Sequence, residues 1–311
     1  MENEKQQITI HEALNERDID AFWEQLHIYL KRDIIPDPED EDRAYFLGED
    51  YRAGIQKAHD RLDDRSHYLF FYRDGKNIGI AMPVIYNTED GKCLIMEFCV
   101  YPEYRGNGTG RQCAGELLKW ARQNGAAYAE LNCGGDERRP RFWKSVGFVP
   151  NGVDQWGEPL MIYTPEEQVS YTVEVMTDPK DWQLLKLENG LMAEIGEKIM
   201  TEEQQERLQE AVKNGKITFF LAKRGYRAVG MCSVARCYSA FCGSDIGKFA
   251  DLFVEPAFRS KGIAKMLVEA AQAWSSKQGF AKLTACCTPH YKNMYKVLGF
   301  KEPMEGSLVL R

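Results

Sequence analysis

Two short segments of the sequence combine glycine and other small residues shortly after a valine that is followed two residues later by proline. In each segment an arginine stands five residues after the valine, which is Val100 in the first and Val254 in the second. Small residues let backbone N–H groups point into one concavity, and a helix that begins there adds partial positive charge. Such a loop is suited to bind a phosphate or pyrophosphate group. The loop residues are Arg105, Gly106, Asn107, Gly108, Thr109 and Gly110 in the first segment, and Arg259, Ser260, Lys261, Gly262, Ile263 and Ala264 in the second.

The two loops are part of a repeat that covers most of the chain. An offset of 154 residues relates Val100 to Val254 and Trp120 to Trp274, and the pair at 147–148 recurs as Gly-Phe at 299–300. A period near half of the 311 residues is too long for a solenoid and indicates a duplicated domain. We therefore predict domains at residues 1–165 and 170–311, with a linker near 164–168.

Each half is predicted to have the same order of elements. Helical apolar spacing at 18–31, and again at 181–195, opens each half, and a second helix follows in each, at 45–62 and from 201. Three strands then lead to the glycine loop, at 68–72, 78–85 and 94–100 in the first half and at 217–223, 229–238 and 248–254 in the second. A helix, a strand and a short helix follow the loop, at 111–124, 127–133 and 139–146 or at 263–278, 282–287 and 291–298.

The loop after Val-x-Pro, with an aromatic-x-x-x-Gly-Phe segment downstream, resembles the GNAT superfamily of acyl-CoA-dependent N-acetyltransferases. The resemblance covers nearly the whole chain as two copies. It implies an α+β fold in each domain, with a mixed sheet flanked by helices and splayed open between its fourth and fifth strands. It also implies acetyl-CoA as co-substrate, with the pyrophosphate on the loop and the pantetheine arm along the strand that ends at Val100 or Val254. A Rossmann loop needs Gly-x-Gly-x-x-Gly, and neither half has that spacing.

The two halves differ at the aromatic residue of this segment. The second half has Tyr295, and the resemblance implies that its hydroxyl protonates the departing CoA thiolate. The first half has Trp143, whose indole N–H is no practical acid. A ring that only packs the helix against the sheet is the alternative role for Tyr295. We expect the second domain to catalyse, and the reverse assignment stays open because the first loop is richer in glycine.

Two carboxylates occupy equivalent positions, three residues before the valine at each strand end. Asp251 in the second half is our candidate catalytic group, and Glu97 in the first half is our candidate for substrate binding. Either could deprotonate an ammonium group or hold it. A solvated or paired strand carboxylate is the alternative for both. His290 is a weaker candidate, since a histidine in a loop is usually a surface residue.

Charge and composition exclude several classes of protein. The formal net charge is −7, which argues against a nucleic-acid binder or a protein held on anionic membranes. The polar start and the lack of a long apolar run predict neither a signal peptide nor a membrane span. Nine cysteines without a Cys-x-x-Cys pair indicate free thiols and no metal. We therefore expect a cytoplasmic protein, a monomer or a homodimer.

The sequence thus predicts an N-acetyltransferase that transfers an acetyl group from acetyl-CoA to a primary amine of a small molecule by direct attack. The alternative is a protein that senses acyl-CoA without turnover. Residues 1–64 hold 8 basic and 18 acidic residues, which suggests a cationic acceptor such as a polyamine or an aminoglycoside. A solvated acidic helix face is the alternative explanation of that charge.

Overall fold

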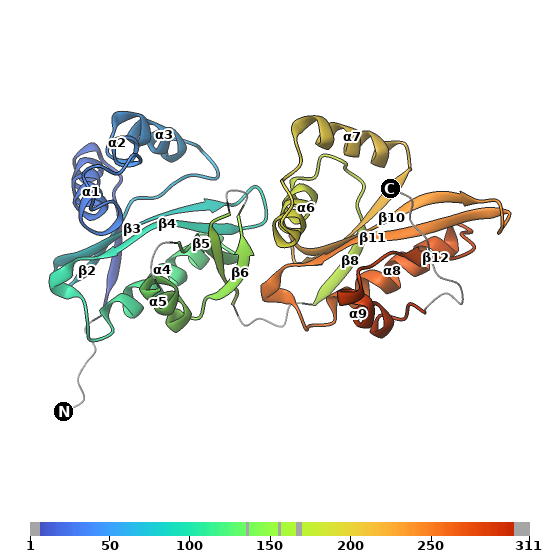
Figure 1. Ribbon diagram of the computed structural model, residues 1–311. Helices are drawn as coiled ribbons and strands as arrows, with labels where there is room; N and C mark the ends of the chain where they lie inside the picture. The colour runs from blue at the N-terminus through green and yellow to red at the C-terminus, as the bar shows by residue number, and fades with distance from the viewer. Residues whose placement is uncertain (1–6, 135–136, 155–156, 166–169, 302–311) are drawn as a thin grey trace, which may run out of the picture. The chain divides into compact units, whose positions relative to one another are not determined.

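The computed structural model describes residues 7–134, 137–154, 157–165 and 170–301. The chain divides into two compact units, Met1–Asn151 with Glu158–Glu167, and Gln168–Arg311 with Gly152–Gly157. Each unit is a mixed sheet with helices on both faces (Figure 1). The predicted fold class, two tandem α+β domains, is confirmed. The domain limits at 165 and 170 stay a prediction, and residues 166–168 of the expected linker lie outside the described residues.

The sheet of the first unit has seven strands in the order β1-β2-β3-β4-β5-β7-β6. The strands are β1 (Thr9–Glu12), β2 (Leu69–Arg73), β3 (Lys76–Tyr86), β4 (Lys92–Val100), β5 (Tyr128–Asn132), β6 (Val149–Val153) and β7 (Pro159–Tyr163). The pairs from β1 to β4 are antiparallel, β4 and β5 are parallel, and β5 and β7 are antiparallel. One face carries α1 (Glu16–Tyr29), α2 (Arg43–Phe46) and α3 (Glu49–His59), and the other carries α4 (Thr109–Gln123) and α5 (Arg138–Val146) (Figure 1).

Both faces of this sheet are buried, which explains the nearly continuous apolar runs of β2 and β3. Side chains alternate between the two faces along a strand. Leu69 and Phe71 of β2 accordingly pack in the core that includes α4, whereas Phe70 packs in the core that includes α1. Each helix layer therefore has its own hydrophobic core, and the sheet between them is held rigidly.

The second unit repeats this plan with five described strands in the order β12-β11-β10-β9-β8. The strands are β8 (Tyr171–Val175), β9 (Ile217–Arg224), β10 (Arg227–Ser239), β11 (Ser244–Val254) and β12 (Leu283–Ala285). The helices are α6 (Trp182–Ile195), α7 (Glu202–Lys213), α8 (Ile263–Lys277) and α9 (Lys292–Val297). A capping box between Thr201 and Gln204 begins α7.

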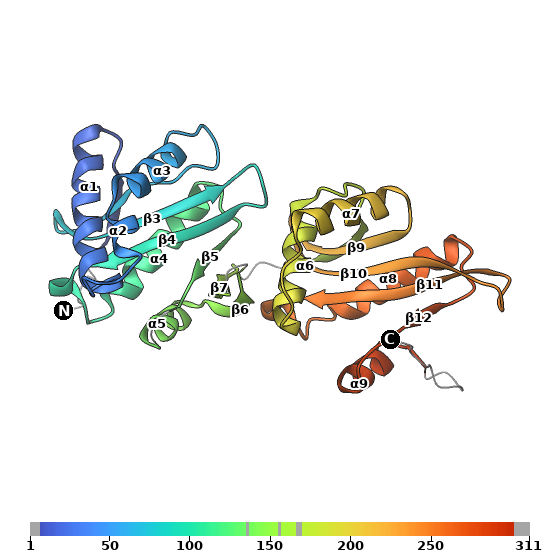
Figure 2. The same cartoon turned by 45° about the horizontal axis from the view of Figure 1, so that its top comes forward.

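Each sheet opens at its parallel strand pair. Strands β4 and β5 are in register only from Lys92 to Leu94, although β4 continues to Val100. In the second unit β11 and β12 are in register only from Gly247 to Phe249, and β11 continues to Val254. Figure 2 shows β5 and β12 turning away from these longer neighbours. The splay that the resemblance implied is therefore present in both domains.

Some elements were not foreseen from the sequence. The short strands β1 and β8 open the two domains, and too few alternating residues mark them. The helix expected over 45–62 is two helices that meet near Gly48, where a Cβ would stand 2.7 Å from the Ala44 carbonyl oxygen. Five residues of π-helix, Leu30–Ile34, extend α1 and carry Asp33 toward the glycine loop. Within the described ranges no helix is both long and apolar enough to cross a bilayer.

A buried ion cluster ties β10 to the end of β11 in the second unit. Arg227 donates to both carboxylate oxygens of Glu255, at 2.8 and 2.9 Å, and Lys186 of α6 lies 2.9 Å from the same carboxylate. Burial opposes ionisation of Glu255, but Arg227 and Lys186 outweigh it and hold its pKa below the usual range. The cluster stabilises the end of β11, the strand that leads into the second glycine loop.

We predict that Glu255→Ala lowers the free energy of unfolding of the second domain by about 3–5 kcal/mol, because the buried guanidinium of Arg227 loses its partner. The folded pKa of Glu255 is depressed, so its contribution is complete above the unfolded value and is lost as pH falls through the folded one. Urea unfolding at several pH values measures both effects. As the control, Glu203→Ala removes an exposed pair with Arg207 and should cost less than about 1 kcal/mol.

Candidate functional site

The first glycine loop is a backbone concavity at the start of α4. Three consecutive residues have left-handed φ angles, namely Gly106 at 91°, Asn107 at 48° and Gly108 at 79°. A Cβ added at Gly106 or Gly108 would contact nothing within 4 Å, so the space beside the loop is open. Within the described part of the chain, no side chain caps the N-terminus of α4. The arrangement leaves the backbone free to bind an anion.

The second loop has the same form at the start of α8. Ser260 and Gly262 have φ angles of 61° and 81°, and no side chain caps α8. A Cβ at Gly262 would also stand in open space. The ammonium of Lys261 lies 5.3 Å from the ring centre of Phe258, which holds this part of the loop. The duplicated sequence motif is therefore a duplicated structure.

The two loop arginines make equivalent contacts behind their loops. Arg105 donates from Nε to the carbonyl oxygen of Val100 at 2.7 Å, and its guanidinium also pairs with Asp33. Arg259 donates from Nε to the carbonyl oxygen of Val254 at 2.9 Å. Its guanidinium pairs with Glu194 near the end of α6. Each arginine thus joins the strand end to the first helix of its domain, and the expected contact with the cofactor stays a prediction.

A cavity of about 710 Å³ lies in the first domain where β4 and β5 diverge. The loop lines one part of it through Gly106, Gly108 and Gly110, and Glu97 and Trp143 line another. The remaining wall comes from the free half of β4, the end of β5, α5, and the end of α1 with its π-helical extension. The cavity thus connects the candidate phosphate site with the carboxylate singled out in the sequence.

Glu97 stands beside a bulge in β4. Met82 of β3 is opposite Glu97 and Pro83 is opposite Ile95, so Met96 is the extra residue. A bulge changes the direction of the side chains next to it. Desolvation raises the pKa of Glu97 to about 8, although Arg139 and a hydrogen bond with Tyr29 oppose the shift. A carboxyl with this pKa exchanges a proton near neutral pH, as a general base must.

Sequence reasoning missed the residues around Glu97. Tyr29 ends α1, and burial, followed by the charge of Glu97, raises the pKa of its hydroxyl well above the usual value. Arg139 of α5 donates to the carbonyl oxygens of Asp33 at 3.0 Å and Gly134 at 3.4 Å. The order of the elements could have revealed Arg139. Helix α5 follows the strand next to the splay, so the pair of arginines at the start of α5 lies at the opening.

Trp143 is an aromatic packing residue as well as a cavity wall. Its side chain is buried, and its ring centre lies 5.0 to 5.2 Å from those of Phe98, Phe142 and Phe148. These contacts are T-shaped, which is a favoured geometry for aromatic pairs. The ring therefore stabilises α5 against the sheet.

In the second domain Asp251 and Tyr295 share one region. Asp251 has a left-handed φ angle of 52° within a bulge of β11, and Ser233 donates to its Oδ2 at 2.5 Å. Tyr295 packs edge-on against Phe249 and Phe300. Burial raises the pKa of Tyr295, and the charges of Cys287 and Asp251 add to that. His290 is exposed and contacts the ring of Tyr291.

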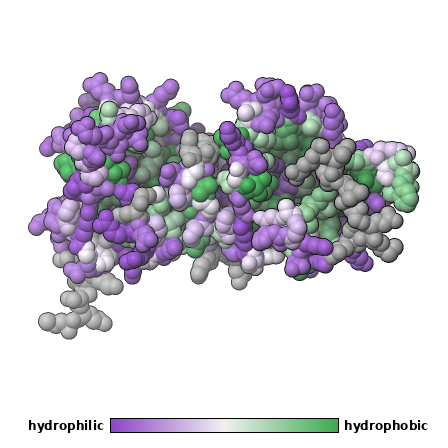
Figure 3. Space-filling model, viewed as in Figure 1, coloured by the Kyte–Doolittle hydropathy of each residue, from purple (hydrophilic) through white to green (hydrophobic). Residues whose placement is uncertain are grey.

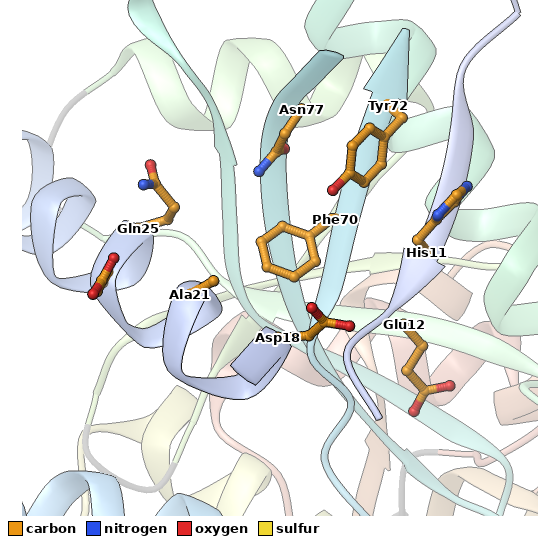
Figure 4. A pocket seen from close by; sticks show the side chains of 9 residues that line it. His11, Glu12, Asp18, Ala21, Gln25, Phe70, Tyr72 and Asn77 are labelled. Carbon is orange, nitrogen blue, oxygen red and sulfur yellow. The ribbon is translucent and has the colours of Figure 1, made fainter. Parts of the chain in front are cut away.

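A smaller cavity, of about 270 Å³, lies between α1 and strands β1 to β3 (Figure 4). Asp18 and Glu12 line it, but both already have partners. Asn15 donates to Asp18 at 2.8 Å, and Glu12 pairs with His67 at 2.7 Å and Arg65 at 2.9 Å. Figure 3 shows hydrophilic side chains over α1 to α3, in accord with a solvated acidic face. The geometry does not join this acidic region to the glycine loop.

Comparison with known proteins gives one family for both halves. The sequence pattern of the acetyltransferase (GNAT) family matches residues 23–148 and 182–300. An aminoglycoside N(6')-acetyltransferase type 1 of Salmonella typhimurium is 28% identical over 100 residues, which are 30% of this chain and 69% of that protein. Among residues the structure describes, no group of three or more His, Cys, Asp or Glu side chains is placed to hold a metal ion.

Solved structures with this likeness each match about half of the chain. An acetyltransferase from Clostridium acetobutylicum, solved with acetyl-CoA, is 13% identical with a TM-score of 0.40, over 45% of this chain and 96% of its own. An aminoglycoside acetyltransferase from an uncultured soil metagenomic sample, in complex with sisomicin, is 19% identical with a TM-score of 0.38. That match covers 45% of this chain and 93% of the other.

We predict that Gly108→Glu and Gly262→Glu each abolish binding of acetyl-CoA to one domain. The new side chain would stand in the open space of the loop and bring a negative charge to a phosphate site. Isothermal titration calorimetry of the full chain should lose one site with each change and both sites with the double change. Unaltered stoichiometry in the double variant would refute the phosphate assignment.

Two other glycines provide matched controls for this experiment. Gly75 and Gly225 lie in the hairpin turns β2–β3 and β9–β10, with φ angles of 74° and 61° and open space around a Cβ. Gly75→Glu and Gly225→Glu therefore impose the same backbone strain and charge at positions that are not part of the loops. Acetyl-CoA binding should be unchanged in both.

Proposed function

Because the chain belongs to the acetyltransferase (GNAT) family, we propose that each of its domains binds acetyl-CoA and that the protein acetylates a primary amine of a small molecule. The observation that carries the proposal is the cavity of the first domain. It joins a loop suited to a pyrophosphate with a carboxyl whose pKa is raised to about 8. Binding of the cofactor on the loop would direct its thioester along the free half of β4, past Glu97.

In the proposed reaction the acceptor first loses a proton from its ammonium group to a carboxylate. The neutral nitrogen then attacks the carbonyl carbon of the thioester, so that a C–N bond forms. Collapse of the tetrahedral intermediate breaks the C–S bond, and the CoA thiolate takes a proton as the amide nitrogen loses its second one. Glu97 would accept the first proton in the first domain and Asp251 in the second.

The two domains would differ in how the thiolate is protonated. In the second domain we assign this step to Tyr295, whose hydroxyl is partly buried near Asp251. In the first domain Trp143 has no acidic proton to give, and the thiolate would take its proton from water. The first domain therefore has a candidate general base, Glu97, whereas Trp143 is not a candidate general acid. The second domain has a candidate for each role, Asp251 as the base and Tyr295 as the acid.

A cationic amine is the proposed acceptor. One relative is an aminoglycoside acetyltransferase, and the strongly acidic first 64 residues of this chain contribute Asp33 to the wall of the large cavity. Aminoglycosides and polyamines both present several ammonium groups to such a surface. We further propose that the protein acts in the cytoplasm, as a monomer or a homodimer.

A role as a sensor of acyl-CoA without turnover is the second proposal for the first domain alone. It is supported by Trp143, which packs in an aromatic cluster where the resemblance expects a tyrosine. Release of CoA with a panel of amines, measured against binding of acetyl-CoA, distinguishes a sensor from an enzyme.

We predict that Tyr295→Phe, in a chain whose first loop is disabled by Gly108→Glu, lowers kcat by roughly 10²–10⁴, as expected for loss of a positioned acid. The affinity for acetyl-CoA should change little, because the ring keeps its contacts with Phe249 and Phe300. Trp143→Phe in the same background is the control and should be neutral. Full activity of the Tyr295→Phe variant would show that Tyr295 is only a packing residue.

We predict that the first domain, isolated in a chain with Gly262→Glu, works faster as pH rises through about 8. Glu97 accepts a proton only when ionised, and its pKa is raised to about 8. Glu97→Gln should remove this dependence and lower kcat by roughly 10²–10⁴. Rates of CoA release between pH 6 and 9.5 measure both. The same pH profile in wild type and Glu97→Gln would exclude Glu97 as the base.

A further inference from the structure

Arg73, the last residue of β2, reaches from the β2–β3 hairpin to the start of α4. One end of its guanidinium donates to Oε1 of Gln112 at 2.7 Å, and the other donates to Oγ1 of Thr109 at 3.4 Å. Thr109 is the first residue of α4, directly after Gly108, and only 3% of it is exposed. Arg73 therefore contacts the helix end that forms the first glycine loop, from a different part of the sheet.

The charge of Arg73 has no counter-ion in the part of the chain that the structure describes. Both of its acceptors are neutral oxygens, and no carboxylate of the described residues forms an ion pair with it. Its Nε is buried and has no hydrogen-bond partner among the same residues. Arg105, which also lies beside the loop, differs in this respect because its guanidinium pairs with Asp33. A partly buried guanidinium without a counter-ion is costly unless a ligand brings the negative charge.

The position of this cation at a helix end makes an anionic ligand more favourable still. The N-terminus of a helix carries partial positive charge, so a cation is disfavoured there and an anion is favoured. The charge of Arg73 is felt within the first turns of α4, because burial raises the pKa of the Cys113 thiol to about 12 and the charge of Arg73 opposes that rise. The space beside Gly106 and Gly108 is open. An anion bound there would compensate both the helix end and Arg73.

The second domain does not repeat this contact. The offset of 154 residues relates Thr109 to Ile263 and Gln112 to Met266. Neither of these side chains has an oxygen that could accept a hydrogen bond from an arginine. Helix α8 nevertheless begins with the same left-handed geometry as α4. The fold therefore does not require the polar pair that holds Arg73, and this pair is a feature of the first loop alone.

We propose that Arg73 is a positioning residue of the first acetyl-CoA site, which fixes the start of α4 and adds positive charge behind the loop that receives the pyrophosphate. Its planar fork can serve two acceptors at once, so one side chain orders Thr109 and Gln112 and keeps its charge near the loop. Arg73 acts through these residues and does not touch the reacting atoms. The identity of the ligand rests on the proposed function, whereas the preference for an anion can be tested without it.

Calorimetric titration of Arg73→Met, in a full chain that also carries Gly262→Glu, tests the charge at the first site alone. The dissociation constant of acetyl-CoA should rise roughly threefold to thirtyfold, as for loss of a cation near a bound anion. It should also depend less on salt, because the charge that salt screens is gone. Arg73→Lys keeps the charge and should retain most of the affinity. Lys76→Met is the matched control, since it removes the same charge from an exposed position of the same hairpin and should change the affinity by less than about twofold.

Inorganic pyrophosphate is titrated in parallel, because it probes the anion site without the thioester. Its affinity should also fall in Arg73→Met and not in Lys76→Met. Equal effects of these two changes would overturn the inference, as would a loss that Arg73→Lys does not restore and that leaves the salt dependence unaltered. Thermal unfolding establishes that each variant is folded. If Arg73→Met does not fold, Gln112→Met removes the shorter of the two hydrogen bonds and must weaken both ligands as well.

The two probes separate failure of this inference from failure of the proposed function. Binding of pyrophosphate but not of acetyl-CoA by the Gly262→Glu chain, weakened by Arg73→Met, would refute the proposed function and support the role of Arg73. Binding of neither ligand would overturn both.

Discussion

The early separation of two parallel strands is the constraint on which the rest of each domain depends. Pairing of β4 with β5 over only three residues leaves six more residues of β4 without a described neighbouring strand on that side. Unpaired backbone inside a protein needs another partner or a ligand. The opening becomes a cavity because two separately packed cores hold the sheet on both faces and prevent its closure. The glycine loop must then start where the unpaired strand ends.

The strand end itself is held by the loop arginine. Arg105 and Arg259 each bond the carbonyl oxygen of the valine five residues earlier and pair with a carboxylate near the end of the first helix. A guanidinium suits this task, because its planar fork can serve two acceptors at once. The position of the loop arginine in the motif suggested a phosphate ligand. In the structure this arginine also holds the end of the strand in place. The loop is pre-organised before any ligand arrives, which reduces the entropic cost of binding.

Features encoded within a few residues could be predicted from the sequence. The two loops require left-handed backbone at Gly108 and Gly262, and the spacing of small residues revealed them. The mixed sheet and its splay between the fourth and fifth strands followed from the family resemblance. Tyr29 and Arg139 escaped prediction because each comes near Glu97 from a different element, far away in the sequence. Helical periodicity marked Tyr29 only as an apolar position.

The two domains keep the same fold but differ in the side chains around the strand carboxylate. The loop, the bracing arginine, the bulge and the strand carboxylate occur in both domains, so these are the parts that the duplication has kept. The groups near the carboxylate come from the first helix and from the helix after the splayed strand. The sequences of these two helices differ between the domains. An arginine near Glu97 favours its ionised form, whereas Asp251 at the corresponding position of the second domain accepts a hydrogen bond from Ser233. Because these neighbours belong to peripheral helices, the charge of each site can change without disturbing the sheet that forms it.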